Sequence, residues 1–142
     1  MARELIALAL GVACAACGRG DAPSTGRPPL AGKAFYRVDP GGPAPCASGT
    51  TCEARVVLTA LGAYHVNKDY PFKFVAEPAP AVPVEGEGTF AVDDARHGTL
   101  TVKFRPTGPG TARLVGTFKL SVCSDDTCEI ETPRLELAIP VS

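Results

Sequence analysis

Two cysteines near the end of the sequence are the residues best suited to do chemistry. The segment KLSVCSDDTCEIE places Cys123 at the end of an alternating, strand-like run, and Cys128 follows after four residues. A close pair of thiols can exchange a disulfide, supply half of a metal site, or close a turn as a structural disulfide. The compartment narrows these possibilities, because disulfides persist in oxidising compartments and are rare in the cytosol.

The amino-terminal segment predicts export. An apolar run without charge extends from Leu5 to Ala16, after a start with a single basic side chain. A membrane span needs about 20 apolar residues, so this shorter run fits a secretory signal better. Small residues precede both Cys17 and Cys14. This pattern resembles a bacterial lipobox, in which the cysteine becomes the lipidated first residue of the mature protein. Lipidation is expected at Cys17, because a polar segment begins directly after it; Cys14 and a signal cleaved without lipidation are the alternatives.

The sequence divides into three segments. We assign residues 1–16 to a lipoprotein signal peptide, residues 17–32 to a flexible tether rich in small and polar residues, and residues 33–142 to one folded domain. The protein is therefore expected in the cell envelope, anchored to a membrane by its lipid. Gly18 carries no inner-membrane retention signal, which favours the outer membrane, facing the periplasm. The sequence holds 14 basic and 15 acidic residues, a balance that argues against nucleic acid as a partner.

Alternation with a period of two predicts strands throughout the folded segment. It is clearest in residues 98–106, 113–122 and 134–141, and shorter candidates lie at 33–38, 53–61, 71–76 and 89–93. Turn signals separate them at 39–45, 77–88, 95–98 and 106–110. About seven short strands without a helical period predict an all-β, immunoglobulin-like antiparallel sandwich. The predicted core comprises Phe72, Phe74, Leu100, Val102, Phe104, Leu114, Phe118, Leu120, Leu135, Leu137 and Ile139.

The four cysteines after the signal form two close pairs. In an exported chain this pattern predicts the disulfides Cys46–Cys52 and Cys123–Cys128, although cross-pairing stays open. A zinc site is the alternative, but the five residues inside the first pair exceed the usual spacing of two to four. The two histidines are expected in turns, His65 between strands and His97 in a solvated turn. We therefore expect neither a metal nor a cofactor.

A family resemblance adds a functional hypothesis. The succession of GAYHVNKDYPFKF, a proline-rich link, GTLTVKFRP and GTARLVGTFKLSVCSDDTCEIETPRLELAIP resembles the N-terminal periplasmic domain of the thiol:disulfide interchange protein DsbD, over about residues 53–141. That domain is an immunoglobulin-like sandwich, and it passes electrons from a membrane partner to other periplasmic thiol proteins. Its redox cysteines lie between the last two strands, which implies this role for Cys123 and Cys128 and a periplasmic thiol-redox protein as partner. The resemblance also implies a shield over the pair from residues 85–98, where Phe90 is the one aromatic residue.

The charges around this pair oppose a reactive thiol. Asp125 and Asp126 lie between the cysteines, and Glu129 and Glu131 follow them. Negative neighbours disfavour a thiolate, although an attacked disulfide can still receive electrons. The first functional prediction is therefore a non-enzymatic binding or interaction module, related to the DsbD N-terminal domain, with structural disulfides. The alternative is a periplasmic thiol-disulfide exchange partner that uses Cys123 and Cys128.

Parity along the preceding strand predicts where this pair lies. If Phe118 and Leu120 face the core, Cys123 falls on the outer face or rim of its sheet. Four residues then turn the chain, and Cys128 returns to bridging distance. The pair is therefore expected to be bonded and reachable by solvent.

Overall fold

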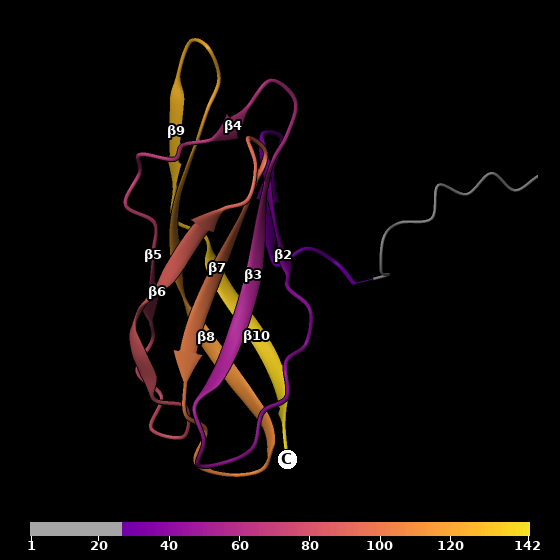
Figure 1. Cartoon of the computed structure of the whole chain (residues 1–142), viewed down its shortest axis with the longest axis vertical. Helices are drawn as coiled ribbons and strands as arrows, with labels where there is room; N and C mark the ends of the chain where they lie inside the picture. Colours follow the sequence, from indigo (N-terminus) through magenta and orange to yellow (C-terminus); the bar gives the residue numbers. More distant parts are fainter. Residues whose placement is uncertain (1–26) are drawn as a thin grey trace, which may run out of the picture.

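The computed structural model describes residues 27–142, which contain ten strands and no helix (Figure 1). The strands are β1 (Ala31–Lys33), β2 (Tyr36–Pro40), β3 (Cys52–Ala60), β4 (His65–Val66), β5 (Lys73–Ala76), β6 (Val84–Val92), β7 (His97–Phe104), β8 (Gly110–Cys123), β9 (Cys128–Glu131) and β10 (Arg134–Val141). The predicted signal peptide, the lipidation sites Cys17 and Cys14 and most of the tether lie outside the described residues. Within 27–142, no helix is long and apolar enough to span a membrane.

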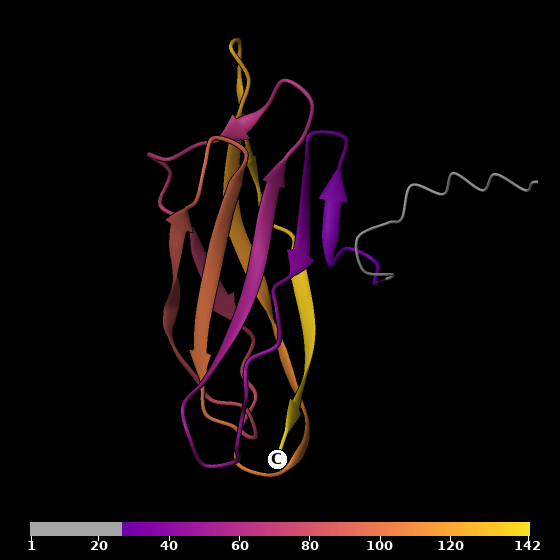
Figure 2. The ribbon, with the colours of Figure 1, turned by 45° about the vertical axis from the view of Figure 1, so that its right-hand side comes forward.

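The strands form two antiparallel sheets that pack into a sandwich, so the predicted all-β architecture is confirmed. One sheet has the order β1-β2-β3-β7-β6. The other is built around β8, which pairs with β10 and β9 along one edge and with β5 and β4 along the other. β9 and β10 continue a single register along β8, interrupted at Thr132 and Pro133. The hairpin of β8 and β9 projects beyond the neighbouring loops at one end of the molecule (Figures 1 and 2).

The core lies between the two sheets. In β3, β7 and the middle of β8 every second residue is buried, as expected for strands with one face on a core, whereas the last four residues of β8 are all buried. Most of the predicted core residues are buried, and Phe74, Phe104 and Phe118 are among the largest fully buried side chains. The others are only partly buried: Phe72 lies before β5, while Leu137 and Ile139 belong to the edge strand β10. An edge strand has a neighbour on one side only, which leaves its side chains less covered.

The sequence prediction of a strand at 33–38 is wrong in detail. The chain turns at Ala34 and Phe35, and β1 pairs back on β2 with Lys33 opposite Tyr36. β1 also begins at Ala31, inside the segment assigned to the tether. Alternation alone cannot separate one strand from two short strands when the intervening turn lacks the usual glycine or asparagine.

All four segments predicted as turns contain strand residues, since β2 ends at Pro40, within 39–45, and β8 begins at Gly110, within 106–110. β6 begins at Val84, within the proline-rich and glycine-rich stretch 77–88, and its pairing with β7 shifts between Glu85 and Thr89. Gly86 and Gly88 have φ values of 71° and 80° there, a conformation that glycine adopts most easily. β7 begins at His97, inside the turn predicted at 95–98. These segments lengthen β6 and β7, and the short strands β1, β4 and β9 raise the count from about seven strands to ten.

Candidate functional site

The Cys123–Cys128 disulfide lies at the end of the projecting β8–β9 hairpin, next to its turn. The two residues are directly opposite each other in the ladder, and their sulfurs are 2.02 Å apart. Beyond them the turn is closed by a hydrogen bond from the Ser124 amide to the Thr127 carbonyl, at 2.8 Å. The Ser124 hydroxyl also accepts hydrogen bonds from the amides of Asp126 and Thr127, at 3.3 Å each. These bonds fix the tip, so the disulfide joins two strands already held in register.

The two sulfur-bearing residues differ in exposure. Cys128 is exposed, whereas Cys123 is only 7% exposed. Leu120 and Val122 are fully buried in the core, so Cys123 has the parity of the outer face, as predicted. The prediction that both cysteines are open to solvent is therefore correct for Cys128 and wrong for Cys123. Neighbouring strands on both edges of β8 account for the burial of Cys123.

Asn67, directly after β4, holds that strand against the end of β8. Its amide donates a hydrogen bond to the Ser121 carbonyl at 3.1 Å, and its side-chain Nδ2 lies 3.2 Å from the Ser121 hydroxyl. Ser121 is fully buried as a result. On the opposite edge of β4, the Val66 amide donates to the carbonyl of Ala95 in the β6–β7 turn, at 2.8 Å. A strand of only two residues is thus fixed from both sides.

His65 is the residue of this site that sequence reasoning missed. It belongs to β4 and lies opposite Cys123 in the β4–β8 ladder, so the expectation that it occupies a turn is wrong. Directly opposite residues on adjacent strands present their side chains on the same face, with Cβ atoms about 4.5 to 5.5 Å apart. His65, Cys123 and Cys128 therefore form a row across three strands, which we call the sulfur–histidine row. The only sequence signal was the place of His65 in the AYHVNKDYP segment.

Acidic residues are frequent on the β8–β9 hairpin, although Glu129 and Glu131 lie opposite Val122 and Leu120, on the other face of the sheet from the row. Asp125 and Asp126 are exposed at the tip of the hairpin, and Glu129 and Glu131 follow on β9. Lys33 forms an ion pair with Glu131 at 2.7 Å, and the hydrogen bond within that pair raises the pKa of the Lys33 ammonium. The pair connects the first strand of the domain to the strand that carries Cys128.

A hollow of about 320 Å³ adjoins the row at His65. It lies between β4, the segment that follows it and the end of the β6–β7 hairpin. Its lining residues are His65, Val66, Asn67, Lys68, Asp69, Val92 and Ala95. Lys68 and Asp69 contribute both signs of charge to the lining, and Val66, Val92 and Ala95 contribute apolar groups.

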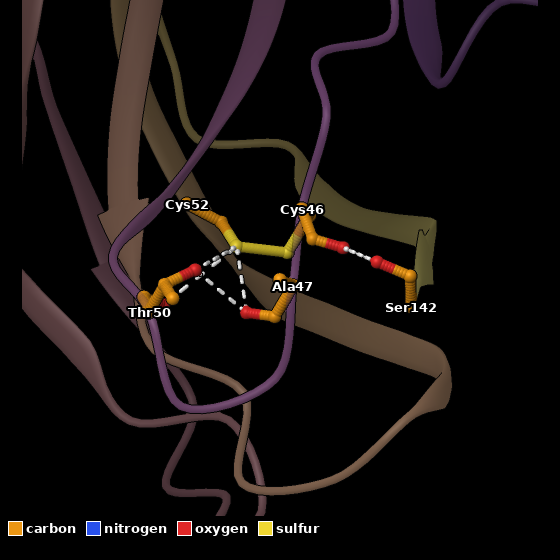
Figure 3. The surroundings of a disulfide bond; sticks show 5 residues. All are labelled: Cys46, Ala47, Thr50, Cys52 and Ser142. Atoms are coloured by element: carbon orange, nitrogen blue, oxygen red, sulfur yellow. Dashed lines mark hydrogen bonds between the residues drawn. A yellow bond between two sulfur atoms is a disulfide. The ribbon is translucent and has the colours of Figure 1, made fainter.

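The second disulfide, Cys46–Cys52, has different surroundings (Figure 3). Both of its residues are buried, with Cys46 9% and Cys52 3% exposed. The loop that it closes is further tied by the Thr50 hydroxyl, which donates to the Ala47 carbonyl at 2.7 Å. The amide of Ser142 donates to the Cys46 carbonyl at 2.9 Å, so the loop also holds the chain after β10. Its burial and these hydrogen bonds are typical of a structural disulfide.

Replacing both Cys46 and Cys52 with serine is expected to lower the free energy of unfolding by about 2 kcal/mol, because the short closed loop no longer restricts the unfolded chain. Denaturant unfolding followed by fluorescence or circular dichroism would measure this change. Since the loop lies at the opposite end of β3 from the β4 segment, reduction of Cys123–Cys128 should keep its wild-type rate. An unfolding midpoint equal to that of the wild type would show that Cys46–Cys52 contributes nothing to stability.

Phe90 does not shield the Cys123–Cys128 disulfide. Its ring stacks on Phe72 with centroids 3.8 Å apart, and it lies 6.0 Å from the ring of Phe118. It therefore packs at the edge of the core, and the expectation of a shield from this residue is wrong. The nearest contribution of residues 85–98 to the row is the Ala95 carbonyl that holds β4.

The acidic side chains of the β6–β7 turn accept hydrogen bonds from residues close to them in the sequence. Asp94 accepts hydrogen bonds from the amides of Arg96 and His97 at 2.8 Å and contacts the ring of His97. The bond from the Arg96 amide, followed by that from the His97 side chain, lowers the pKa of the Asp94 carboxyl. Asp93 accepts a hydrogen bond from the Thr99 hydroxyl. Across residues 27–142, no group of three or more His, Cys, Asp or Glu side chains is arranged to hold a metal ion.

Comparisons with protein-family models, with curated proteins and with solved structures found no match for this chain.

Proposed function

We propose that this protein is a lipid-anchored thiol-disulfide exchange partner of the cell envelope, and that Cys123–Cys128 is the couple that exchanges. The contrast between the two disulfides carries the proposal. Cys46 and Cys52 are both buried, whereas Cys128 is exposed on a hairpin that projects from the domain. Exchange requires that a thiolate reach one sulfur of the disulfide, and Cys128 is the residue of this pair that solvent reaches.

The acidic surroundings fit a couple that receives electrons. A thiolate from the partner attacks the Cys128 sulfur, the sulfur–sulfur bond breaks, and its electron pair leaves on Cys123. A second thiol of the partner then displaces Cys128, so the partner is oxidised to a disulfide and the pair becomes two thiols. In this direction the pair supplies no nucleophile, so the effect of Asp125 and Asp126 on thiolate formation at Cys128 does not limit the attack. The acidic rim favours a partner whose surface is basic around its cysteine.

The resemblance to the DsbD N-terminal domain supports the same assignment, because that domain carries its redox pair between its last two strands. Lipidation at Cys17, or at Cys14, would hold the domain at a membrane, in the outer membrane if Gly18 directs sorting as expected. The partner is then a thiol-redox protein of the periplasm.

A second function is favoured by the burial of Cys123 and by the carboxylates around the hairpin. In that case both disulfides are structural, and the domain is a non-enzymatic binding module. The two functions differ in reduction potential, since structural disulfides generally lie below about −300 mV and exchange couples lie above it.

Single serine substitutions test the exchange function through the difference in exposure. Cys123→Ser leaves the exposed Cys128 as a free thiol. By the reverse of the second step, it attacks the disulfide of the oxidised partner and should trap a mixed disulfide with that periplasmic protein, visible on non-reducing gels and identified by mass spectrometry. Cys128→Ser leaves only the buried Cys123 and should trap little. Cys46→Ser and Cys52→Ser are the controls for a free buried thiol. If Cys123→Ser gave no more adduct than these controls and the couple resisted reduction as strongly as Cys46–Cys52, the binding module would be the better assignment.

A further inference from the structure

In the β4–β8 ladder, His65 lies opposite Cys123, the residue whose sulfur must leave during the proposed exchange. The register of β4 on β8 places it directly opposite Cys123, and the register of β9 places Cys128 opposite Cys123 on the other edge. Attack at the exposed Cys128 puts the departing electron pair on Cys123. Across the adjacent strands β9, β8 and β4, the row therefore contains the attacked residue Cys128, the residue of the leaving sulfur Cys123, and His65, in that order.

We infer that His65 is a catalytic residue of this exchange, which supplies a positive charge or a proton to the Cys123 sulfur as it leaves. This inference rests on the proposed function. Histidine is the side chain suited to that task near neutral pH, because its ring can carry a proton and give it up. A leaving thiol departs faster when its thiolate is stabilised, and a nearby cation stabilises a thiolate.

The surroundings of Cys123 offer little other stabilisation for a thiolate, so a cation or proton donor is needed there. Its residue is only 7% exposed, so water stabilises a thiolate there poorly. The charged residues of the hairpin turn, Asp125 and Asp126, are negative and oppose the new charge. His65 is the neighbour on the opposite strand that can offset it.

Asn67 positions His65 rather than acting on the sulfur. Its two hydrogen bonds to Ser121, through the amide and through Nδ2, fix the chain two residues after His65 against β8. The bond between the Val66 amide and the Ala95 carbonyl fixes the residue between them. His65 itself is exposed, so it can exchange its proton with solvent after each turnover.

The test is the rate at which dithiothreitol reduces each disulfide of the purified, oxidised protein. Samples are quenched with an alkylating reagent, and mass spectrometry counts the modified cysteines on each peptide. His65→Gln should slow reduction of Cys123–Cys128 about tenfold, whereas His65→Lys, which keeps a positive charge, should remain close to wild type. His97→Gln is the matched control, because His97 contacts Asp94 in the β6–β7 turn. The Cys46–Cys52 rate is the internal reference.

A merely structural role for His65 predicts the opposite sign. If its loss loosened β4, Cys123 would become more exposed and reduction would become faster. Faster reduction, an unchanged rate in His65→Gln, or an equal slowing in His97→Gln would each overturn the inference. Those results would leave the proposed function standing, since that function fails only if Cys123→Ser traps no partner and the couple resists reduction.

Discussion

Replacing Phe118 with alanine is expected to lower the free energy of unfolding by about 3 to 5 kcal/mol. Phe118 is fully buried in the middle of β8 and lies opposite Phe74 in the β5–β8 ladder. The rings of Phe72 and Phe90 lie 6.2 and 6.0 Å from it, so truncation leaves a cavity lined by aromatic groups. Small domains are stable by about 5 to 15 kcal/mol, and this loss would unfold a large share of a marginal one.

Denaturant unfolding and hydrogen exchange would measure the effect of Phe118→Ala. Thr111→Ala is a matched control on the same strand, because Thr111 is exposed. Exchange rates in Phe118→Ala that equal those of the wild type would mean that Phe118 does not lie between the sheets.

Gly116→Ala should also destabilise the domain, by about 3 kcal/mol, because β8 has no space for a side chain at this position. A Cβ atom added there would lie 2.5 Å from the Val75 carbonyl oxygen and would overlap the ring of Phe74. Gly108→Ala is the control, since an added Cβ at Gly108 meets no atom within 4 Å. Thermal or denaturant unfolding of both variants gives the difference directly.

A second substitution separates the two sources of this clash. Combining Gly116→Ala with Phe74→Leu removes the ring but keeps the carbonyl, so part of the loss should be recovered relative to the sum of the single changes. An additive double variant would show that the ring does not contribute. A stable Gly116→Ala variant would contradict the close approach of β5 to β8.

The sequence predicted those parts of the fold in which local pattern and tertiary packing agree. Residues 98–106, 113–122 and 134–141 alternate strongly, and they correspond to β7, β8 and β10. Short spacing likewise predicted both disulfides, because few pairings of nearby cysteines are feasible.

The part of the site that could not be predicted depends on contacts distant in sequence. β4 has only two residues, too few for any period, and it exists through hydrogen bonds from Asn67 to Ser121 and from Val66 to Ala95. The position of His65 opposite Cys123 follows from those bonds. The burial of Cys123 has the same origin, since parity gives the face of a strand and not what covers it.

The position of β8 at the centre of its sheet has a consequence for the kinetics of folding. β9 and β10 follow β8 directly and can pair with it as a hairpin at once, but β4 and β5 must first close a long loop to reach its other edge. β3 faces the same delay on the side of β7, because their ladder joins Cys52 to Phe104. Contacts of such long range slow folding to the scale of milliseconds to seconds. During that time the unpaired edges and the apolar faces of β3 and β8 are open to other chains, and aggregation competes most strongly with folding at these two strands.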